Sequence, residues 1–215
     1  TITIVLVVRS HGINGSQYFA TAHVFLLLYL LLFVNSAVAA DPTIRYFSLL
    51  LRLAALSLAS LFNILYATSF TGSQVGVRQL VILSLVAAAT VLFIMTDPAH
   101  HLVVASLLIP EEPIAVFESA RFGPGYVVYG MLSLVGCFIP AALFLRFAHT
   151  HRGRQAQQAR ILGIANIMII VPYVLYGISL GLLARTLPPP LPIILVVTSV
   201  FVVVILYQRR LLDVL

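Results

Sequence analysis

Long apolar stretches recur along this chain, and they constrain its fold more than any other feature. An α-helix needs about 20 apolar residues to cross the roughly 30 Å hydrocarbon core of a bilayer. Residues 1–8 form a shorter run, which we expect to be the remainder of a first helix in a fragment of a longer polypeptide. Six runs of about the spanning length follow, separated by short connections: residues 18–39, 44–68, 75–95, 126–147, 161–184 and 191–207. The sequence therefore predicts an all-α integral membrane protein, a receptor-like seven-helix bundle of six complete transmembrane helices plus a truncated first helix, forming a single domain over residues 1–215.

The charge content agrees with a chain that is solvated mainly by lipid. Only 8% of the residues are charged and 61% are hydrophobic, whereas about a quarter of the residues in a soluble domain are charged. The net charge of +6 does not indicate nucleic-acid binding, because too few charges are available to follow a phosphate backbone. All 12 basic residues are arginine, a bias typical of GC-rich bacterial genomes. We expect the lipid bilayer of a bacterial inner membrane as the main partner, and no nucleic acid.

The arginines also predict how the chain is oriented, because cytoplasmic loops carry an excess of basic residues. If the first helix ends in the cytoplasm, eight arginines fall on the cytoplasmic side and three on the other, with Arg52 inside a span. All carboxylates except Asp213 then lie on the outer side. The prediction is an outer N-terminus and a cytoplasmic C-terminus.

One predicted span carries a polar stripe. At 100° per residue, Arg45, Ser48, Arg52, Asn63 and Tyr66 lie within an arc of about 60° on the helix over residues 44–68. A polar group in a bilayer costs free energy unless it is partnered, so the stripe should face other helices. Asn166 and Tyr173 share a face of another span. We therefore predict a polar cavity formed by these residues: Ser48, Arg52, Asn63, Tyr66, Asn166 and Tyr173.

Arg52 has two interpretations. It can bind an anionic or polar ligand in this cavity, or its long side chain can extend to the outer interface and bond helix carbonyls. No carboxylate lies within the spans. In the cavity we expect neutral partners for Arg52, which are backbone oxygens, the amides of Asn35 or Asn166, or the hydroxyl of Tyr173. The carboxylates of Asp41 and Asp97 are the next candidates as partners of Arg52, if the outer loops fold inward.

No cofactor or catalytic centre is predicted. His23 has no second histidine at its depth, as a bis-histidine haem would require. His100 and His101 are adjacent, so on a helix they point about 100° apart and suit one metal ion poorly; we expect a structural role at the membrane boundary. No nucleophile–base pair or phosphate-binding loop is found in the sequence. The chain is expected not to be an enzyme.

The outer segment over residues 96–124 is the longest connection. Its apolar part, residues 102–109, predicts an amphipathic or re-entrant piece at the interface, before the acidic residues Glu111 and Glu112. The segment is a candidate ligand surface, or a lid that caps the bundle.

Three motifs give a resemblance over nearly the whole chain. Thr96-Asp97-Pro98-Ala99-His100-His101 follows one span, Arg152-Gly153-Arg154-Gln155 precedes another, and Arg210-Leu211-Leu212-Asp213-Val214 follows the last. Their order resembles the seven-helix N-terminal sensor region of bacterial histidine kinases and related diguanylate cyclases. Asp97 stands where that family tends to have Asn, no Trp is present, and we expect no PAS, kinase or cyclase domain after Leu215. The resemblance implies a receptor-like module whose output chemistry is carried elsewhere, with an exit into the cytoplasm at Arg209, Arg210 and Asp213.

Three functions remain open at this point. The first is a sensor that transmits a signal, from an unknown small ligand or from the outer face, through the last helix. The second is a non-catalytic accessory subunit of a larger respiratory or photosynthetic membrane complex, with other membrane proteins as partners; a homodimer is a further possible assembly. The third, a haem or quinone redox protein, is weakened by the unpaired His23.

Overall fold

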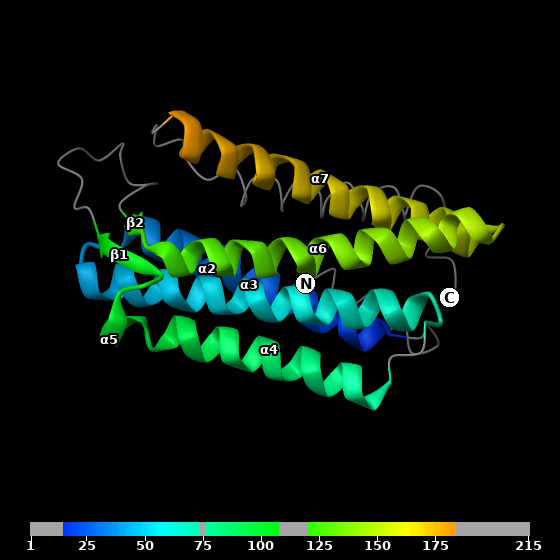
Figure 1. Ribbon diagram of the computed structural model, residues 1–215, viewed down its shortest axis with the longest axis horizontal. Helices are drawn as coiled ribbons and strands as arrows, with labels where there is room; N and C mark the ends of the chain where they lie inside the picture. Colours follow the sequence, from blue (N-terminus) through cyan, green and yellow to red (C-terminus); the bar gives the residue numbers. More distant parts are fainter. Residues whose placement is uncertain (1–14, 74–75, 108–119, 184–215) are drawn as a thin grey trace.

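The computed structural model describes residues 15–73, 76–107 and 120–183, which are mostly helical (Figure 1). A short antiparallel sheet of two strands lies at one end of the bundle. The helices are α2 (Ser16–Val38), α3 (Pro42–Phe70), α4 (Val77–Met95), α5 (Asp97–His100), α6 (Pro124–Thr150) and α7 (Arg154–Leu183), and the strands are β1 (Val104–Leu107) and β2 (Ala120–Phe122).

Four of the described helices are long and apolar enough to cross a membrane, namely α2, α3, α4 and α6. This confirms the prediction of a helical, multi-pass membrane protein. Helix α7 is 30 residues long and includes most of the span expected over residues 161–184. The expected helices over residues 1–8 and 191–207 lie outside the described residues, so the count of seven stays a prediction.

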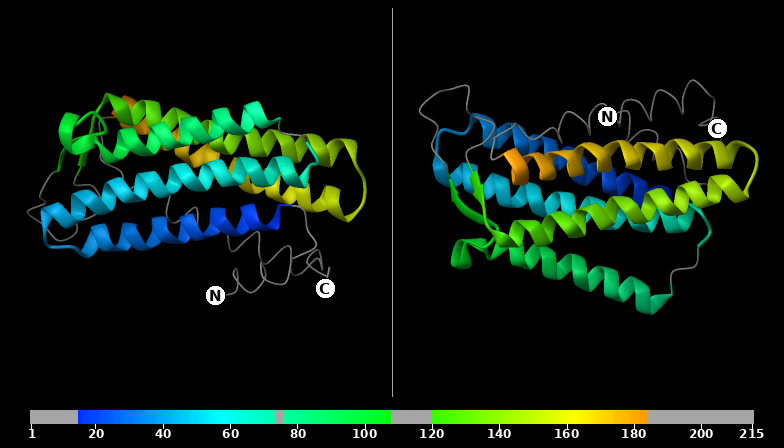
Figure 2. Two further views of the ribbon diagram at one scale, coloured as in Figure 1. Left: turned by 90° about the horizontal axis from the view of Figure 1, so that it is seen from below. Right: turned by 45° about the horizontal axis from the view of Figure 1, so that its top comes forward.

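Helix α3 is the centre of the bundle. It packs against α2, α4 and α6, and α7 packs against α6 (Figures 1 and 2). Asp41 begins α3 by accepting a hydrogen bond from the Thr43 amide at 2.7 Å, and Pro42 occupies the first helical position, where a missing N–H costs nothing. The central position of α3 explains why it is the most buried of the four spans.

The core divides into groups of side chains along the length of α3. One group lies near its C-terminal end, where Tyr66 and Phe144 pack with small residues of α7. Another lies near its N-terminal end, where Leu50 and Tyr129 pack against Ile94 and the start of the hairpin. Between α3 and α6, Gly136 allows a close approach, because an added Cβ would lie 2.5 Å from the Cβ of Ser60.

The segment over residues 96–124 contains two strands, which corrects the prediction of an all-α chain; the placement of residues 102–109 at a membrane interface stays a prediction. The segment starts with the single turn α5 and continues as β1, which pairs antiparallel with β2 through Val104↔Phe122 and Leu107↔Ala120. The helical turn ends at His101, whose φ is 52°. The backbone amides of Val103 and Val104 donate to the side chain of Asp97 and not to helical carbonyls, so the helix cannot continue through them.

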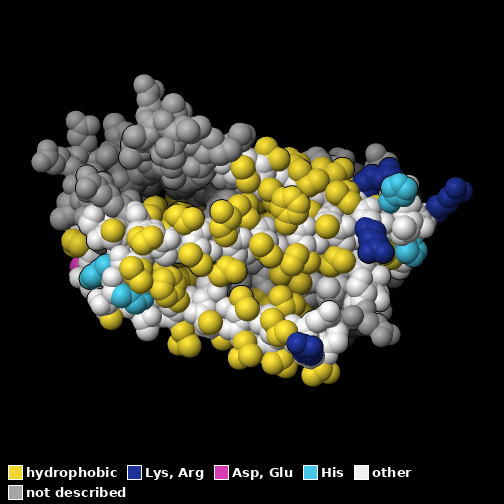
Figure 3. Space-filling view, viewed as in Figure 1, with side chains coloured by type: hydrophobic (Ala, Val, Ile, Leu, Met, Phe, Trp, Pro, Cys, Tyr) yellow, Lys and Arg dark blue, Asp and Glu magenta, His cyan; other side chains and the backbone are white. Residues whose placement is uncertain are grey.

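Basic side chains gather at one end of the bundle (Figure 3). The start of α4, the end of α6 and the start of α7 meet there (Figure 1). This end carries Arg78, Arg146, Arg152, Arg154 and Arg160. The opposite end, where α3 begins and α4 finishes, carries Asp41 and Asp97.

Candidate functional site

Arg52 lies against two aromatic rings of the neighbouring helix. Its guanidinium carbon is 5.7 Å from the ring centroid of Tyr29 and 5.1 Å from that of Phe33, which are one turn apart on α2. Within the described residues its buried Nε has no hydrogen-bond partner. The head group thus faces another helix, as expected. The partners found among the described residues are the faces of aromatic rings, which attract a cation through their quadrupole, in place of the oxygen atoms that we expected.

The carbonyl bond considered for Arg52 is instead made by Arg45, two turns earlier on α3. Its Nη2 donates to the carbonyl oxygen of Ala39, just after α2, at 2.9 Å. Arg45 thereby satisfies a carbonyl at the C-terminal end of α2. Arg52 lies about 15 Å beyond the first residue of α3, and it retains a donor without an acceptor among the described residues.

Asn63 and Asn166 connect α3 with α7. The Nδ2 of Asn63 donates to the Oδ1 of Asn166 at 2.8 Å, and the Nδ2 of Asn166 donates to the carbonyl oxygen of Leu162 at 2.9 Å. Asn166 is buried. A hydrogen bond between amide side chains holds membrane helices together, because the alternative is a polar group in hydrocarbon.

The other residues of the predicted stripe have different surroundings. Tyr66 is buried in an aromatic group, with ring centroids 5.0 Å from Phe19 and 5.7 Å from Phe144. Ser48 accepts a hydrogen bond from the Nδ2 of Asn35 at 2.7 Å. The structure therefore places Arg52, the asparagine pair and Tyr66 at separate contacts along α3, each with a different set of neighbours.

Three predicted site positions cannot be compared with the structure, and a fourth only in part. Tyr173 belongs to α7, but its side chain is outside the described part of the chain. Arg209, Arg210 and Asp213 lie outside the described residues altogether.

Asp97 connects several segments at the end of the bundle that carries the two strands (Figure 1). It is fully buried, and its carboxylate accepts hydrogen bonds from the Tyr46 hydroxyl at 2.8 Å and from the amides of Val103 and Val104 at 2.7 and 3.1 Å. The Nδ1 of His100 lies 3.5 Å from Asp97 Oδ1. Among the described residues, no group of three His, Cys, Asp or Glu side chains could hold a metal ion. Asp97 thus connects α3 with the residues that lead into β1, whereas the role expected for His100 and His101 at the membrane boundary stays a prediction.

His23 forms a hydrogen bond within its own helix, α2. Its Nδ1 lies 2.8 Å from the carbonyl oxygen of Phe19 and donates to it. This bond satisfies a buried ring nitrogen within α2, which is a sufficient reason for a histidine at this position.

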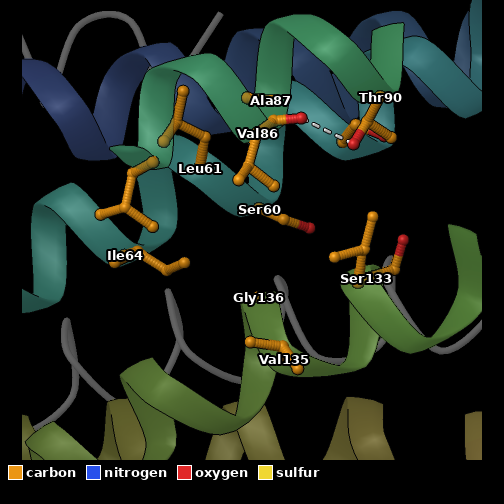
Figure 4. Close-up of a pocket in the computed structure, with 12 residues that line it drawn as sticks. Ser60, Leu61, Ile64, Val86, Ala87, Thr90, Ser133, Val135 and Gly136 are labelled. Atoms are coloured by element: carbon orange, nitrogen blue, oxygen red, sulfur yellow. Dashed lines mark hydrogen bonds between the residues drawn. The ribbon is translucent and has the colours of Figure 1, made fainter. Parts of the chain in front are cut away.

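A cavity of about 90 Å³ lies between α3, α4 and α6, midway along each helix (Figure 4). Its walls are mainly apolar, with four hydroxyl groups among them. The lining residues with hydroxyl groups are Ser57, Ser60, Thr90 and Ser133.

Sequence reasoning missed the cavity and the aromatic partners of Arg52. Tyr29 and Phe33 are four residues apart on α2, a spacing that places both on one face, but only the packing of α2 on α3 turns that face toward Arg52. The hydroxyl residues of the cavity are single polar positions on apolar spans, a pattern that gives no signal until the helices are assembled.

Comparison with known proteins agrees with this architecture. Searches among curated proteins and among solved structures give no match. The profile of one protein family, described as the N-terminal 7TM region of histidine kinase, matches residues 1–215. A match over the full length, together with four helices suited to cross a membrane among the described residues, identifies the family. The chain belongs to the N-terminal seven-transmembrane regions of histidine kinases.

Proposed function

We propose that this chain is the sensory and signal-transducing part of a histidine kinase-type receptor and has no catalytic activity of its own. The family match over residues 1–215 is the observation that carries the proposal. The chain sits in a bacterial inner membrane, with its N-terminus outside and its C-terminus in the cytoplasm. The basic end of the bundle, where α6 ends near Arg146 and α7 begins at Arg154, faces the cytoplasm in this orientation (Figure 1).

Arg52 is the position at which a signal acts on the bundle. Its guanidinium is held by ring faces of α2 and keeps an unsatisfied donor. An anionic or strongly hydrogen-bond-accepting ligand competes with the rings, because charge-assisted hydrogen bonds are stronger than a cation–π contact. Loss of the ring contacts then loosens α2 from α3.

Helix α3 passes this change along the bundle. It carries Arg52 and, about three turns further on, Asn63, which is bonded to Asn166 of α7. Movement of α3 is transmitted to α7 through this bond, and onward through the last predicted span to Arg209, Arg210 and Asp213. Transmission requires two packing states that differ in affinity for the signal.

A chimera tests the proposal. Residues 1–215 are joined at Leu215 to the cytoplasmic dimerisation and catalytic domains of a histidine kinase, and autophosphorylation is measured in native membranes. We expect Arg52→Gln and Asn63→Leu each to change the phosphorylation level by several-fold, while Arg78→Gln at the start of α4 leaves it unchanged. Phosphorylation that is insensitive to both bundle variants contradicts the proposal.

Purification in mild detergent tests the accessory-subunit alternative. A sensor elutes alone or as a dimer. Stoichiometric elution with other membrane subunits favours an accessory role.

A further inference from the structure

The cavity between α3, α4 and α6 brings together hydroxyl groups from three helices. Ser60 of α3, Thr90 of α4 and Ser133 of α6 direct their oxygens toward the same gap (Figure 4). The remaining walls are apolar, with Leu61, Val86 and Ala87 among them, and no charged residue lines the cavity. Three converging hydroxyls in an otherwise apolar space suit a molecule with one small polar group on an apolar body.

The hydrogen bonds already made determine which polar group fits. Ser60 donates to the Leu56 carbonyl at 3.0 Å and Thr90 donates to the Val86 carbonyl at 2.7 Å. Their protons are committed to their own helices, so only their oxygen lone pairs are left for a ligand. These two residues can accept a hydrogen bond from a ligand but cannot donate one.

Ser133 supplies the complementary group. It is buried, and its hydroxyl donates to no carbonyl of the described part of the chain. The hydroxyl of Tyr129, one turn earlier, forms a side-chain hydrogen bond with it. That tyrosine is 2% exposed, and no other hydrogen-bond partner of its hydroxyl is found among the described residues. Two hydroxyl groups that share one hydrogen bond use only one of their two protons, so when the Tyr129 hydroxyl donates, the proton of Ser133 is left for a ligand that can accept.

We propose that this cavity binds a small uncharged molecule that carries a hydroxyl group on an apolar body, in the chemical class of the short-chain aliphatic alcohols. The ligand hydroxyl donates to Thr90 or Ser60 and accepts from Ser133. A ketone could only accept and an alkane could do neither. The absence of charge in the lining excludes an ionised ligand, because nothing there would offset its desolvation.

Size and access agree with this class of ligand. A cavity of about 90 Å³ is several times the space that one water molecule needs, and it accommodates a chain of a few carbon atoms. Helix α4 packs on α3 and makes few contacts with α6, so the ligand can enter from the bilayer between α4 and α6. Binding here does not depend on whether the bundle transmits a signal.

Binding is tested with the full chain in lipid nanodiscs, using trifluorobutanol as the probe and fluorine NMR as the readout. We expect a saturable bound signal above the partitioning seen in empty nanodiscs. Thr90→Val and Ser133→Ala remove one hydroxyl each with little change in volume, and each should weaken binding by about two- to tenfold, as expected for one neutral hydrogen bond. Ala87→Leu fills the cavity and should abolish the saturable signal.

Thr68→Val is the matched control. Thr68 also donates to a carbonyl of its own helix, that of Ile64 at 3.0 Å, but it does not line the cavity, so binding should be unchanged. A signal that is equally strong in the Ala87→Leu, Thr90→Val and Ser133→Ala variants overturns the proposal, since it reports partitioning into lipid. Equal affinity for a fluorinated alkane of the same length overturns the role of the hydroxyl groups. If Ala87→Leu does not fold, the affinities of Thr90→Val and Ser133→Ala decide whether the cavity binds the alcohol.

Discussion

At the scale of single residues, the free-energy cost of placing Arg52 in the membrane can be compared with the free energy gained from its cation–π contacts. An arginine near the middle of a membrane helix costs about 2.5–3.5 kcal/mol on insertion scales. Cation–π contacts with the rings of Tyr29 and Phe33 return about 0.5–2 kcal/mol. The cost of burying the guanidinium exceeds the gain from the rings, so Arg52 is not explained by stability.

Replacing Arg52 with methionine should therefore stabilise the bundle. From the difference between this cost and this gain we expect Arg52→Met to raise the free energy of unfolding by about 1 kcal/mol, measured by thermal unfolding in detergent. Arg78→Met is the control, because Arg78 is exposed in the first turn of α4 and its loss should give no such gain. A clear loss of stability in Arg52→Met would mean that the ring contacts contribute more free energy than burial of the guanidinium costs.

For Asp97 we expect the opposite effect, a loss of stability when its charge is removed. Its carboxylate accepts from one hydroxyl and two backbone amides, and an asparagine would place an NH₂ group against one of these donors. Bonds to a charged acceptor contribute about 1.5–3 kcal/mol each, so Asp97→Asn should destabilise the protein by about 2 kcal/mol. Amide hydrogen exchange at Val103 and Val104 should accelerate as well.

Asp41→Asn is a matched control for this variant. Asp41 is exposed and caps α3 through one bond to the Thr43 amide, and asparagine caps a helix about as well as aspartate. Its stability should stay within about 0.5 kcal/mol of the wild type. If both variants lose the same stability, the burial of Asp97 is not what matters.

At the scale of helices and strands, composition predicted more of the spans than it did of the hairpin. Apolar runs such as residues 44–68 must satisfy their backbone groups internally in lipid, and a helix does so without reference to the rest of the chain. The hairpin depends on a carboxylate that reaches from Asp97 to the amides of Val103 and Val104. That contact is tertiary, and the apolar pattern of residues 102–109 does not encode it.

The close approach of α6 to α3 at Ser60 depends on Gly136. An added Cβ at Gly136 would lie 2.5 Å from the Cβ of Ser60, which sits directly on the α3 backbone and cannot turn away. We expect Gly136→Ala to destabilise the bundle by about 1–3 kcal/mol, the usual cost of overpacking, in a thermal or denaturant titration.

Two variants check the cause of this loss. At Gly163 the added Cβ would meet the side chain of Leu145 at 2.8 Å, which can change rotamer, so Gly163→Ala should cost less. Adding Ser60→Gly to Gly136→Ala removes the clashing atom and should recover part of the stability. Additive losses in the double variant would show that the two helices do not meet at this pair.

At the scale of the whole molecule, the polar stripe shows what a sequence can and cannot predict about a site. Helical spacing placed Arg52, Asn63 and Tyr66 on one face of α3, and each contacts another helix. Spacing did not predict the partners, which are aromatic rings of α2 for Arg52, an amide of α7 for Asn63, and rings of α2 and α6 for Tyr66. The identity of each partner is a property of the assembled bundle.

The final prediction concerns the orientation of the bundle in the membrane. Arg78, Arg146 and Arg154 lie at the end of the bundle opposite to Asp41, and an excess of arginine marks the cytoplasmic side. In intact spheroplasts of a Cys137→Ala background, a membrane-impermeant maleimide should label Thr43→Cys at the start of α3. Thr150→Cys at the end of α6 should be labelled only after permeabilisation. Both positions are exposed, so the barrier between thiol and reagent is the membrane. The reverse labelling pattern would place the arginine-rich end outside, against the charge rule, and would contradict the proposed orientation.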